Sequence, residues 1–148
     1  MSDLELMQAA LSQARLALEK GEVPVGAVIA REGKIIAAAH NEREPKKNAL
    51  LHAETSAIGA ACEALGGWRL PGCTLYVTLE PCPMCAGAVL AAQLPRVVVG
   101  ASDEKAGAFG GLFDLRACKG LYRTTVSFGL CAEEAKRLLQ DFFRTLRG

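Results

Sequence analysis

Two short motifs contain the residues in this sequence that could do chemistry. His52-Ala53-Glu54 places an imidazole two residues before a carboxylate, and Pro81-Cys82-Pro83-Met84-Cys85 places two thiols three residues apart. One histidine and two cysteines can hold a zinc ion, and three protein ligands leave its fourth tetrahedral position open. An open position is typical of a catalytic zinc site, because water held there becomes acidic near neutral pH. We therefore predict a zinc site, one ion per subunit, with His52, Cys82 and Cys85 as its ligands.

Glu54 is the natural proton carrier beside these ligands. A carboxylate that is not itself bound to the metal can accept a proton from water and pass it to a substrate. Cys82 and Cys85 share one face of a helix at this spacing. A helix N-terminus favours the thiolate, which is the form that binds metal. We predict that the helix beginning near His52 points its N-terminus at the helix beginning near Cys82, with the zinc ion between them.

Each motif also has a simpler interpretation. A C-x-x-C pattern after a strand and at the start of a helix is also typical of a thioredoxin-like redox site. A structural zinc site would need a fourth ligand, and the spare candidates nearby are Cys62, Cys73 and His40. His52 and Glu54 at a helix start favour the catalytic site over both alternatives. The cysteines outside the motif are most simply small buried apolar residues: Cys62, Cys73, Cys118 and Cys131.

The elements that must position these motifs alternate along the chain. Apolar periodicity predicts helices over 3–20, 52–65, 82–92 and 132–146, and strands over 23–30, 34–39, 73–79, 96–100 and 124–128. Residues 41–51 and 102–111 are expected to be loops. Strands that alternate with helices indicate an α/β layered fold with a central sheet.

Size and composition are those of one globular domain. A length of 148 residues suits a single domain over 1–148, and no apolar run is long enough to span a bilayer. Residues 1–5 are acidic and lack the basic region of a signal peptide, so we expect a cytoplasmic protein. A net charge of +1 does not indicate nucleic-acid binding, but it does not exclude a local basic patch.

The H-x-E…P-C-x-x-C pattern is typical of zinc-dependent nucleobase deaminases. With its surroundings, the chain resembles the TadA family of tRNA-specific adenosine deaminases from about Glu5 to Arg147. The segments that carry the resemblance are Val23–Val28, Trp68–Leu70, Thr74–Glu80, Met84–Ala88 and Asp141–Arg144.

The resemblance implies a fold, a reaction and an assembly. The fold is a cytidine-deaminase-like three-layer α/β/α sandwich with a central mixed five-stranded sheet. The reaction is hydrolytic conversion of adenosine to inosine at the wobble position of a tRNA anticodon, with zinc-activated water. The assembly is a homodimer with the site near the subunit interface. His52, Cys82 and Cys85 match the family's zinc ligands, and Glu54 matches its proton shuttle.

Three further residues match the family's substrate contacts. Asn41 corresponds to an asparagine that hydrogen-bonds the target base, and an amide offers both a donor and an acceptor to a base edge. A simpler role for Asn41 is to support a turn. Ala53 corresponds to a backbone contact with the base, and Asp103 to an aspartate near the sugar of the target nucleotide.

The zinc pattern alone leaves the substrate open, because cytidine and guanine deaminases share it. The alternative function is therefore deamination of a free base or nucleoside such as guanine, cytosine or cytidine. Two groups of basic residues could bind phosphate, or could be ordinary solvated charges: Arg43, Lys46 and Lys47 in the first loop, and Lys136, Arg137, Arg144 and Arg147 near the C-terminus. Trp68 is expected to pack beneath a loop.

Overall fold

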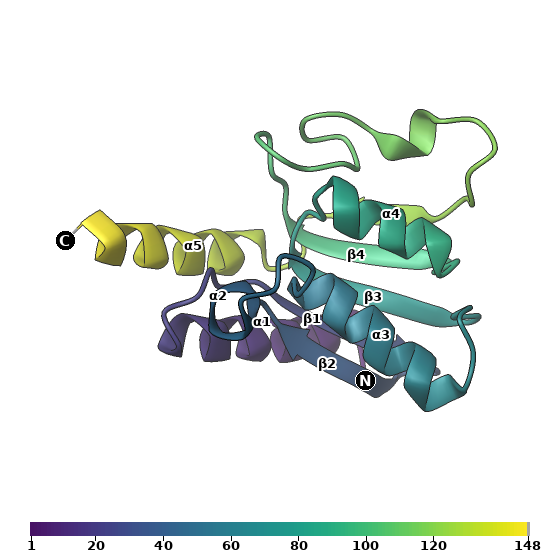
Figure 1. Cartoon of the computed structure of the whole chain (residues 1–148), viewed down its shortest axis with the longest axis horizontal. Coiled ribbons are helices and arrows are strands. Elements are labelled where there is room, and N and C mark those ends of the chain that lie inside the picture. Colours follow the sequence, from purple (N-terminus) through teal and green to yellow (C-terminus); the bar gives the residue numbers. More distant parts are fainter. Residues whose placement is uncertain (148) are drawn as a thin grey trace.

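The computed structural model of the chain describes residues 1–147. In chain order its elements are α1 (Asp3–Glu19), β1 (Gly26–Arg31), β2 (Lys34–His40), α2 (Arg43–Lys46), α3 (Ala53–Leu65), β3 (Cys73–Leu79), α4 (Pro83–Ala91), β4 (Arg96–Ala101), the 3₁₀ helix η1 (Leu115–Ala117), β5 (Thr125–Phe128) and α5 (Ala132–Arg147) (Figure 1). None of the helices formed by residues 1–147 combines the length and the apolar composition needed to cross a bilayer.

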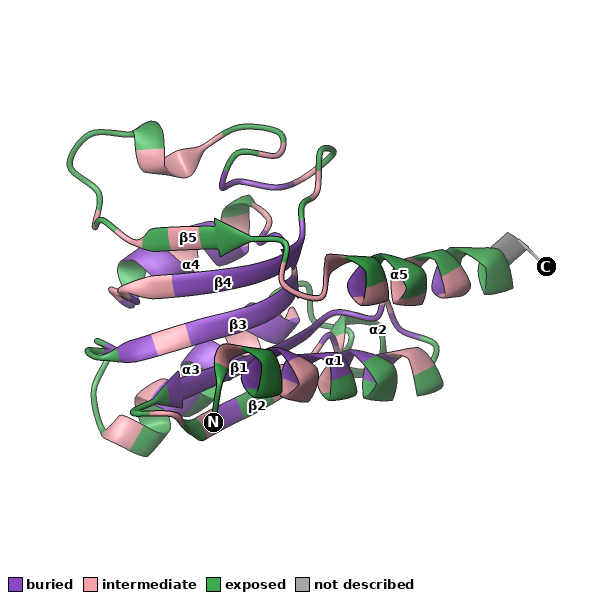
Figure 2. Cartoon of the chain, turned by 180° about the vertical axis from the view of Figure 1, so that it is seen from behind, coloured by how far each residue is buried: buried purple, intermediate pink, exposed green. Residues whose placement is uncertain are grey.

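The strands form one mixed five-stranded sheet in the order β2-β1-β3-β4-β5. β1 is antiparallel to both β2 and β3, whereas β4 is parallel to β3 and β5. Helices α3 and α4 lie together on one face of the sheet, and α1 and α5 lie on the other (Figures 1 and 2). The three-layer α/β/α sandwich with a mixed five-stranded sheet is therefore confirmed.

Strands β3 and β4 are buried on both faces, because helices cover the sheet from both sides (Figure 2). Successive side chains of a strand point to opposite faces. Leu75 and Val77 of β3 accordingly pack with α3 and α4, while Tyr76 packs with α1 and α5. Gly26 lets β1 approach α1 closely, since a Cβ atom there would overlap the carbonyl oxygen of Ala10.

The start of α1 is fixed to the sheet by a polar cluster. Asp3 accepts hydrogen bonds from Arg96 Nη2 at 2.6 Å and from the Tyr76 hydroxyl at 2.5 Å. The hydrogen bonds from Arg96, followed by that from Tyr76, lower the pKa of Asp3 to about 2. Burial, followed by the contact with Asp3, raises the pKa of Tyr76 to about 12. The cluster links the start of α1 to β3 and β4, and its ion pair is present at pH values where Asp3 is ionised.

The predicted helices and strands are present, with shifted ends. β1 begins at Gly26 instead of residue 23, because the chain before it turns and the Val25 N–H donates to the Val23 carbonyl at 2.9 Å. The expectation of an irregular 41–51 loop is wrong in one respect, since it contains the short helix α2. Trp68 does not pack beneath a loop: it is 59% exposed, and the Arg69 guanidinium lies 4.5 Å from its ring centre. Cys118 is exposed, contrary to the expectation that it is buried.

Candidate active site

The two motifs meet where α3 and α4 begin. His52 is the N-cap of α3, and Cys82 is the N-cap of α4, with Pro83 at the first helical position, where its missing N–H has no consequence. An N-cap side chain usually bonds to its own helix, but neither of these does. Their imidazole and thiol groups are therefore available to each other and to Cys85 in the first turn of α4.

The distances between these groups fit a tetrahedral zinc ion. His52 Nδ1 lies 3.6 Å from Cys82 Sγ and 3.5 Å from Cys85 Sγ. Zinc bonds of about 2.0 Å to nitrogen and about 2.3 Å to sulfur would hold such atoms roughly 3.5 Å apart. His52 and Cys82 are half-buried and Cys85 is buried, so one side of the group is open to a ligand.

The other ligand candidates named from the sequence lie outside this group. Among residues 1–147, His52, Cys82 and Cys85 alone form a cluster of histidine, cysteine or carboxylate groups that could hold a metal. His40 is engaged elsewhere, with its ring nitrogens 3.1 Å from Gln13 and from Lys20. The donor set matches a three-ligand site better than a four-ligand structural site.

Glu54 lies in the first turn of α3 and is 4% exposed. Its burial raises the pKa of the carboxyl group to about 7. The hydrogen bond from the Cys85 thiol, with further help from the Cys85 backbone N–H, lowers the pKa of Cys82 to about 5. The same hydrogen bond, together with burial, raises the pKa of Cys85. One thiolate and a carboxyl group able to exchange a proton near neutral pH thus lie side by side.

A cavity of about 190 Å³ opens onto this group. It is smaller than the roughly 300 Å³ of the smallest drug-sized pockets, so its size suits a small ring. The cavity is lined by Val23, Val25, Asn41, Arg43, His52, Ala53, Glu54, Leu79, Glu80, Cys82, Asp103 and Ala106. All the predicted site residues line it except Cys85, which is buried.

Asn41 stands in the wall of this cavity with half of its hydrogen-bonding capacity in use. Its Nδ2 donates to Glu22 Oε1 at 3.1 Å, and its Oδ1 accepts from the Arg43 backbone at 3.2 Å. An amide has two N–H groups and an oxygen with two lone pairs, so one donor and one acceptor remain for a ligand. The two roles considered for Asn41, turn support and base recognition, are therefore compatible.

Asp103 also lines the cavity and belongs to the 102–111 loop. Its Oδ1 accepts from the backbone N–H groups of Lys105 and Ala106 at 3.0 and 3.2 Å. Its own backbone N–H donates to Glu80 Oε1 at 2.9 Å.

Sequence reasoning missed two buried carboxylates, Glu22 and Glu80, which are 2% and 3% exposed. Glu22 accepts a hydrogen bond from the backbone of Glu44 in α2, next to the lining residue Arg43, and Glu80 accepts one from the backbone of the lining residue Asp103. Glutamate is mostly a surface residue, so its type alone gives no signal of this role. The available hint was position: Glu80 directly follows a strongly apolar strand and precedes the Pro81-Cys82 motif.

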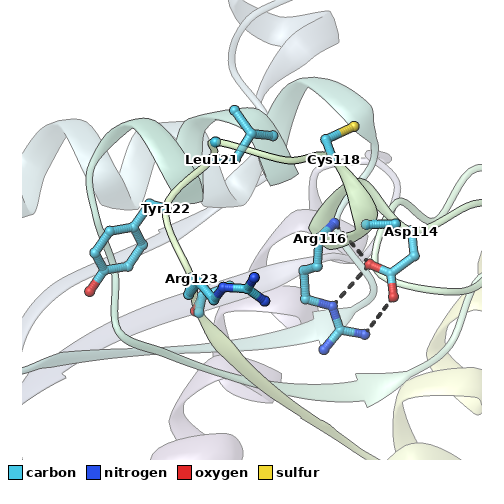
Figure 3. A pocket seen from close by; sticks show the side chains of 9 residues that line it. Asp114, Arg116, Cys118, Leu121, Tyr122 and Arg123 are labelled. Atoms are coloured by element: carbon cyan, nitrogen blue, oxygen red, sulfur yellow. Dashed lines mark hydrogen bonds and ion pairs between the residues drawn. The ribbon is translucent and has the colours of Figure 1, made fainter.

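A second cavity, of about 630 Å³, is larger but holds none of the predicted site residues. It lies in the segment from Asp114 to Thr124, shown in Figure 3. The Arg116 guanidinium donates to both carboxylate oxygens of Asp114 at 2.9 Å, so its charge is already paired. The larger volume of this second cavity therefore does not make it the candidate active site.

The basic residues named from the sequence differ in their positions and in their ion pairs. Arg43 lines the small cavity, and Lys46 and Lys47 follow it on the surface of α2 and its C-terminal cap. On α5, Lys136 pairs with Glu133 and Arg144 with Asp141. The side chain of Arg147 lies outside the described part of the structure. The α2 group is thus the one beside the candidate site.

Known proteins match both the sequence and the fold. The model of the MafB19-like deaminase family matches residues 1–147. The tRNA-specific adenosine deaminase of Bacillus subtilis (strain 168) is 50% identical over 142 residues, which cover 95% of this chain and 88% of that protein.

Two solved structures are also similar. A structure from a study of A-to-I editing by tRNA:A34 deaminases has a TM-score of 0.86 and 41% identity, covering 91% of this chain and 99% of that one. Guanine deaminase from Nitrosomonas europaea has a TM-score of 0.82 and 27% identity, covering 95% and 84%. The chain therefore belongs to the MafB19-like deaminases and to the family of tRNA-specific adenosine deaminases that its sequence motifs predict.

Proposed function

We propose that this protein hydrolyses adenosine to inosine at the wobble position of a tRNA anticodon. One observation carries the proposal: a cavity of about 190 Å³ joins the His52 and Cys82 side chains to Glu54 and Asn41. The 50% identity to a tRNA-specific adenosine deaminase supports the choice of substrate. The reaction replaces the C6–N bond of adenine with a C6–O bond and releases ammonia.

His52, Cys82 and Cys85 would hold a zinc ion, which supplies water that ionises near neutral pH when it is bound. Glu54 handles the protons. Its carboxylate accepts one proton from the attacking water and delivers it to a ring nitrogen of the base. It then assists protonation of the amino group that leaves. Burial of Glu54 keeps this exchange away from bulk solvent.

The remaining cavity residues bind and orient the nucleotide. The free donor and acceptor of Asn41 match the edge of a purine, and the backbone at Ala53 offers a second contact. Asp103, which also lines the cavity, is within the loop that would face the sugar. A base in an anticodon loop is already partly unstacked, so its extrusion into the cavity requires little free energy. Arg43, Lys46 and Lys47 supply positive charge for the neighbouring phosphates.

We also propose a homodimer, a single domain over 1–148 and a cytoplasmic location. The dimer is supported by exposed apolar side chains in the segments around the site, including Leu50 at 61% and Leu112 at 60% exposure, which a second copy could cover. The cytoplasm is a reducing compartment, which suits cysteine ligands because thiols form disulfides in oxidising compartments. Light scattering of the purified protein tests the dimer, and a monomer at micromolar concentration would contradict it.

Guanine deamination is the second candidate, because the fold also matches a guanine deaminase. Purified protein should be assayed for inosine in tRNA and for ammonia release from guanine, cytosine, cytidine and free adenosine. We expect inosine in tRNA and little ammonia from the small molecules. Release of ammonia from a free base without any inosine in tRNA would replace the proposed function with the second candidate.

A further inference from the structure

Glu80 occupies the junction between the sheet and the zinc-ligand motif. It follows β3, and its backbone N–H donates to the Ala101 carbonyl at the end of β4 at 2.9 Å. Its side chain is 3% exposed and lines the candidate substrate cavity. The backbone of Glu80 is therefore fixed by the sheet, and its carboxylate has a defined direction.

That carboxylate accepts three backbone N–H groups from one loop. The Asp103 N–H donates to Oε1 at 2.9 Å, while those of Phe109 and Gly111 donate to Oε2 at 3.0 and 2.9 Å. Hydrogen bonds from N–H groups to a charged oxygen are stronger than those between neutral groups. The 103–111 loop contains no helix or strand, so these bonds replace the secondary structure that it lacks.

The 103–111 loop also packs closely against the Glu80 carboxylate. A Cβ atom on Gly107 would overlap the Glu80 carboxylate, and one on Gly111 would lie 2.7 Å from Glu80 Oε1. The Ala108 N–H donates to the Pro81 carbonyl at 2.9 Å, which ties the same loop to the motif that contains Cys82. The loop thus wraps around Glu80 on several sides.

We propose that Glu80 is a positioning residue for the substrate cavity: its buried carboxylate holds the 103–111 loop in place and thereby sets the position of Asp103 in the cavity lining that also includes Asn41. The inference rests on the proposed function in one respect, that Asp103 contacts the bound nucleotide. Glu80 acts through Asp103 and does not need to touch the substrate.

The test replaces the acceptor-only carboxylate with an amide of the same size, Glu80→Gln. The amide has a single oxygen, so its NH2 group must face at least one of the loop N–H donors. The matched control is Glu104→Gln, the same change on an exposed side chain of the same loop with no hydrogen bond or ion pair among residues 1–147. Zinc content is measured in each protein and should not change.

Hydrogen exchange provides the readout that is independent of activity. In RNA-free wild-type protein, the amides of Asp103, Phe109 and Gly111 should exchange at least about tenfold more slowly than that of Glu104, which lacks a partner in the described structure. Glu80→Gln should remove this protection and Glu104→Gln should keep it. Equal exchange of all four amides in the wild type would overturn the proposal even if Glu80→Gln does not fold.

Kinetics with an anticodon stem-loop RNA separate positioning from a general structural role. Glu80→Gln should raise KM about tenfold with a smaller change in kcat, because a binding contact is displaced. In an Asp103→Ala background the same change should raise KM less than about threefold, since the contact is already absent. A tenfold rise in both backgrounds would mean that Glu80 does not act through Asp103. An inactive wild type with protected loop amides would contradict the proposed function and leave the loop assignment intact.

Discussion

Replacing Glu22 with glutamine tests how the wall that contains Asn41 is held. The Glu22 carboxylate accepts from Val23 N at 3.3 Å, from Asn41 Nδ2 at 3.1 Å and from Glu44 N at 2.9 Å. Glutamine has one oxygen, so if that oxygen stays with Asn41 and Val23, its NH2 group faces the N–H of Glu44. The variant then loses one charge-assisted hydrogen bond and weakens two others.

The size of the effect follows from these contacts. A hydrogen bond to a charged group contributes about 1.5–3 kcal/mol, and a buried donor without a partner costs about 1–3 kcal/mol. We expect the free energy of unfolding of Glu22→Gln to fall by about 2–3 kcal/mol, which lowers Tm by about 4–12 °C in a chain of this length. Displacement of Asn41 should also reduce kcat/KM on an anticodon stem-loop about tenfold or more.

Thermal unfolding followed by circular dichroism measures the first effect, and inosine formation measures the second. Glu44→Gln is the matched control, because its side chain is 76% exposed and lies 3.8 Å from Arg43. The control should change the free energy of unfolding by less than about 0.5 kcal/mol. If Glu22→Gln and Glu44→Gln had the same Tm, the buried carboxylate would not be a support of the Asn41 wall.

Three other variants, with Cys118→Ala as a control, test the proton carrier, the metal ligands and the Asp3 cluster. Glu54→Gln should keep its zinc and lower kcat by about 10²- to 10⁴-fold, as measured by metal analysis and single-turnover rates; full activity would contradict the proton-carrier role. Cys82→Ala should lose both zinc and activity in the same assays, while Cys118→Ala, at an exposed cysteine that does not line the candidate substrate cavity, should keep both. Asp3→Asn should be less stable than wild type at pH 7, by less than about 1 kcal/mol because the pair is partly exposed. Because the pKa of Asp3 is lowered to about 2, its contribution to the free energy of unfolding is present above about pH 4 and disappears as the pH falls toward 2. The free energies of unfolding of the two proteins, measured with urea, should therefore converge near pH 2.

The sequence predicted the parts of this molecule that depend on local pattern. Apolar alternation located β3 at Cys73–Leu79, and the helix-start signals placed His52 and Cys82 at two N-termini. Both follow from short-range rules that act within one element. The meeting of those N-termini was predicted from the chemistry that a shared metal requires, and the structure brings them together.

The parts that could not be predicted depend on contacts between distant segments. The burial of Glu22 and Glu80 was not predicted, because most of their partners are backbone N–H groups with no sequence signature. Trp68 was expected to pack beneath a loop, yet it is 59% exposed and its ring centre lies 4.5 Å from the Arg69 guanidinium. The residues that support the site were thus harder to predict than the residues that form it.

Zinc content and inosine formation, measured on the same sample, test the central claim most directly. Protein purified with its metal should contain about one zinc ion per chain and convert adenosine to inosine at the wobble position of an anticodon stem-loop. Activity should fall in proportion to zinc removed by a chelator, and zinc should restore it. Undiminished inosine formation by zinc-free protein would contradict the assignment of His52, Cys82 and Cys85 as the catalytic metal site.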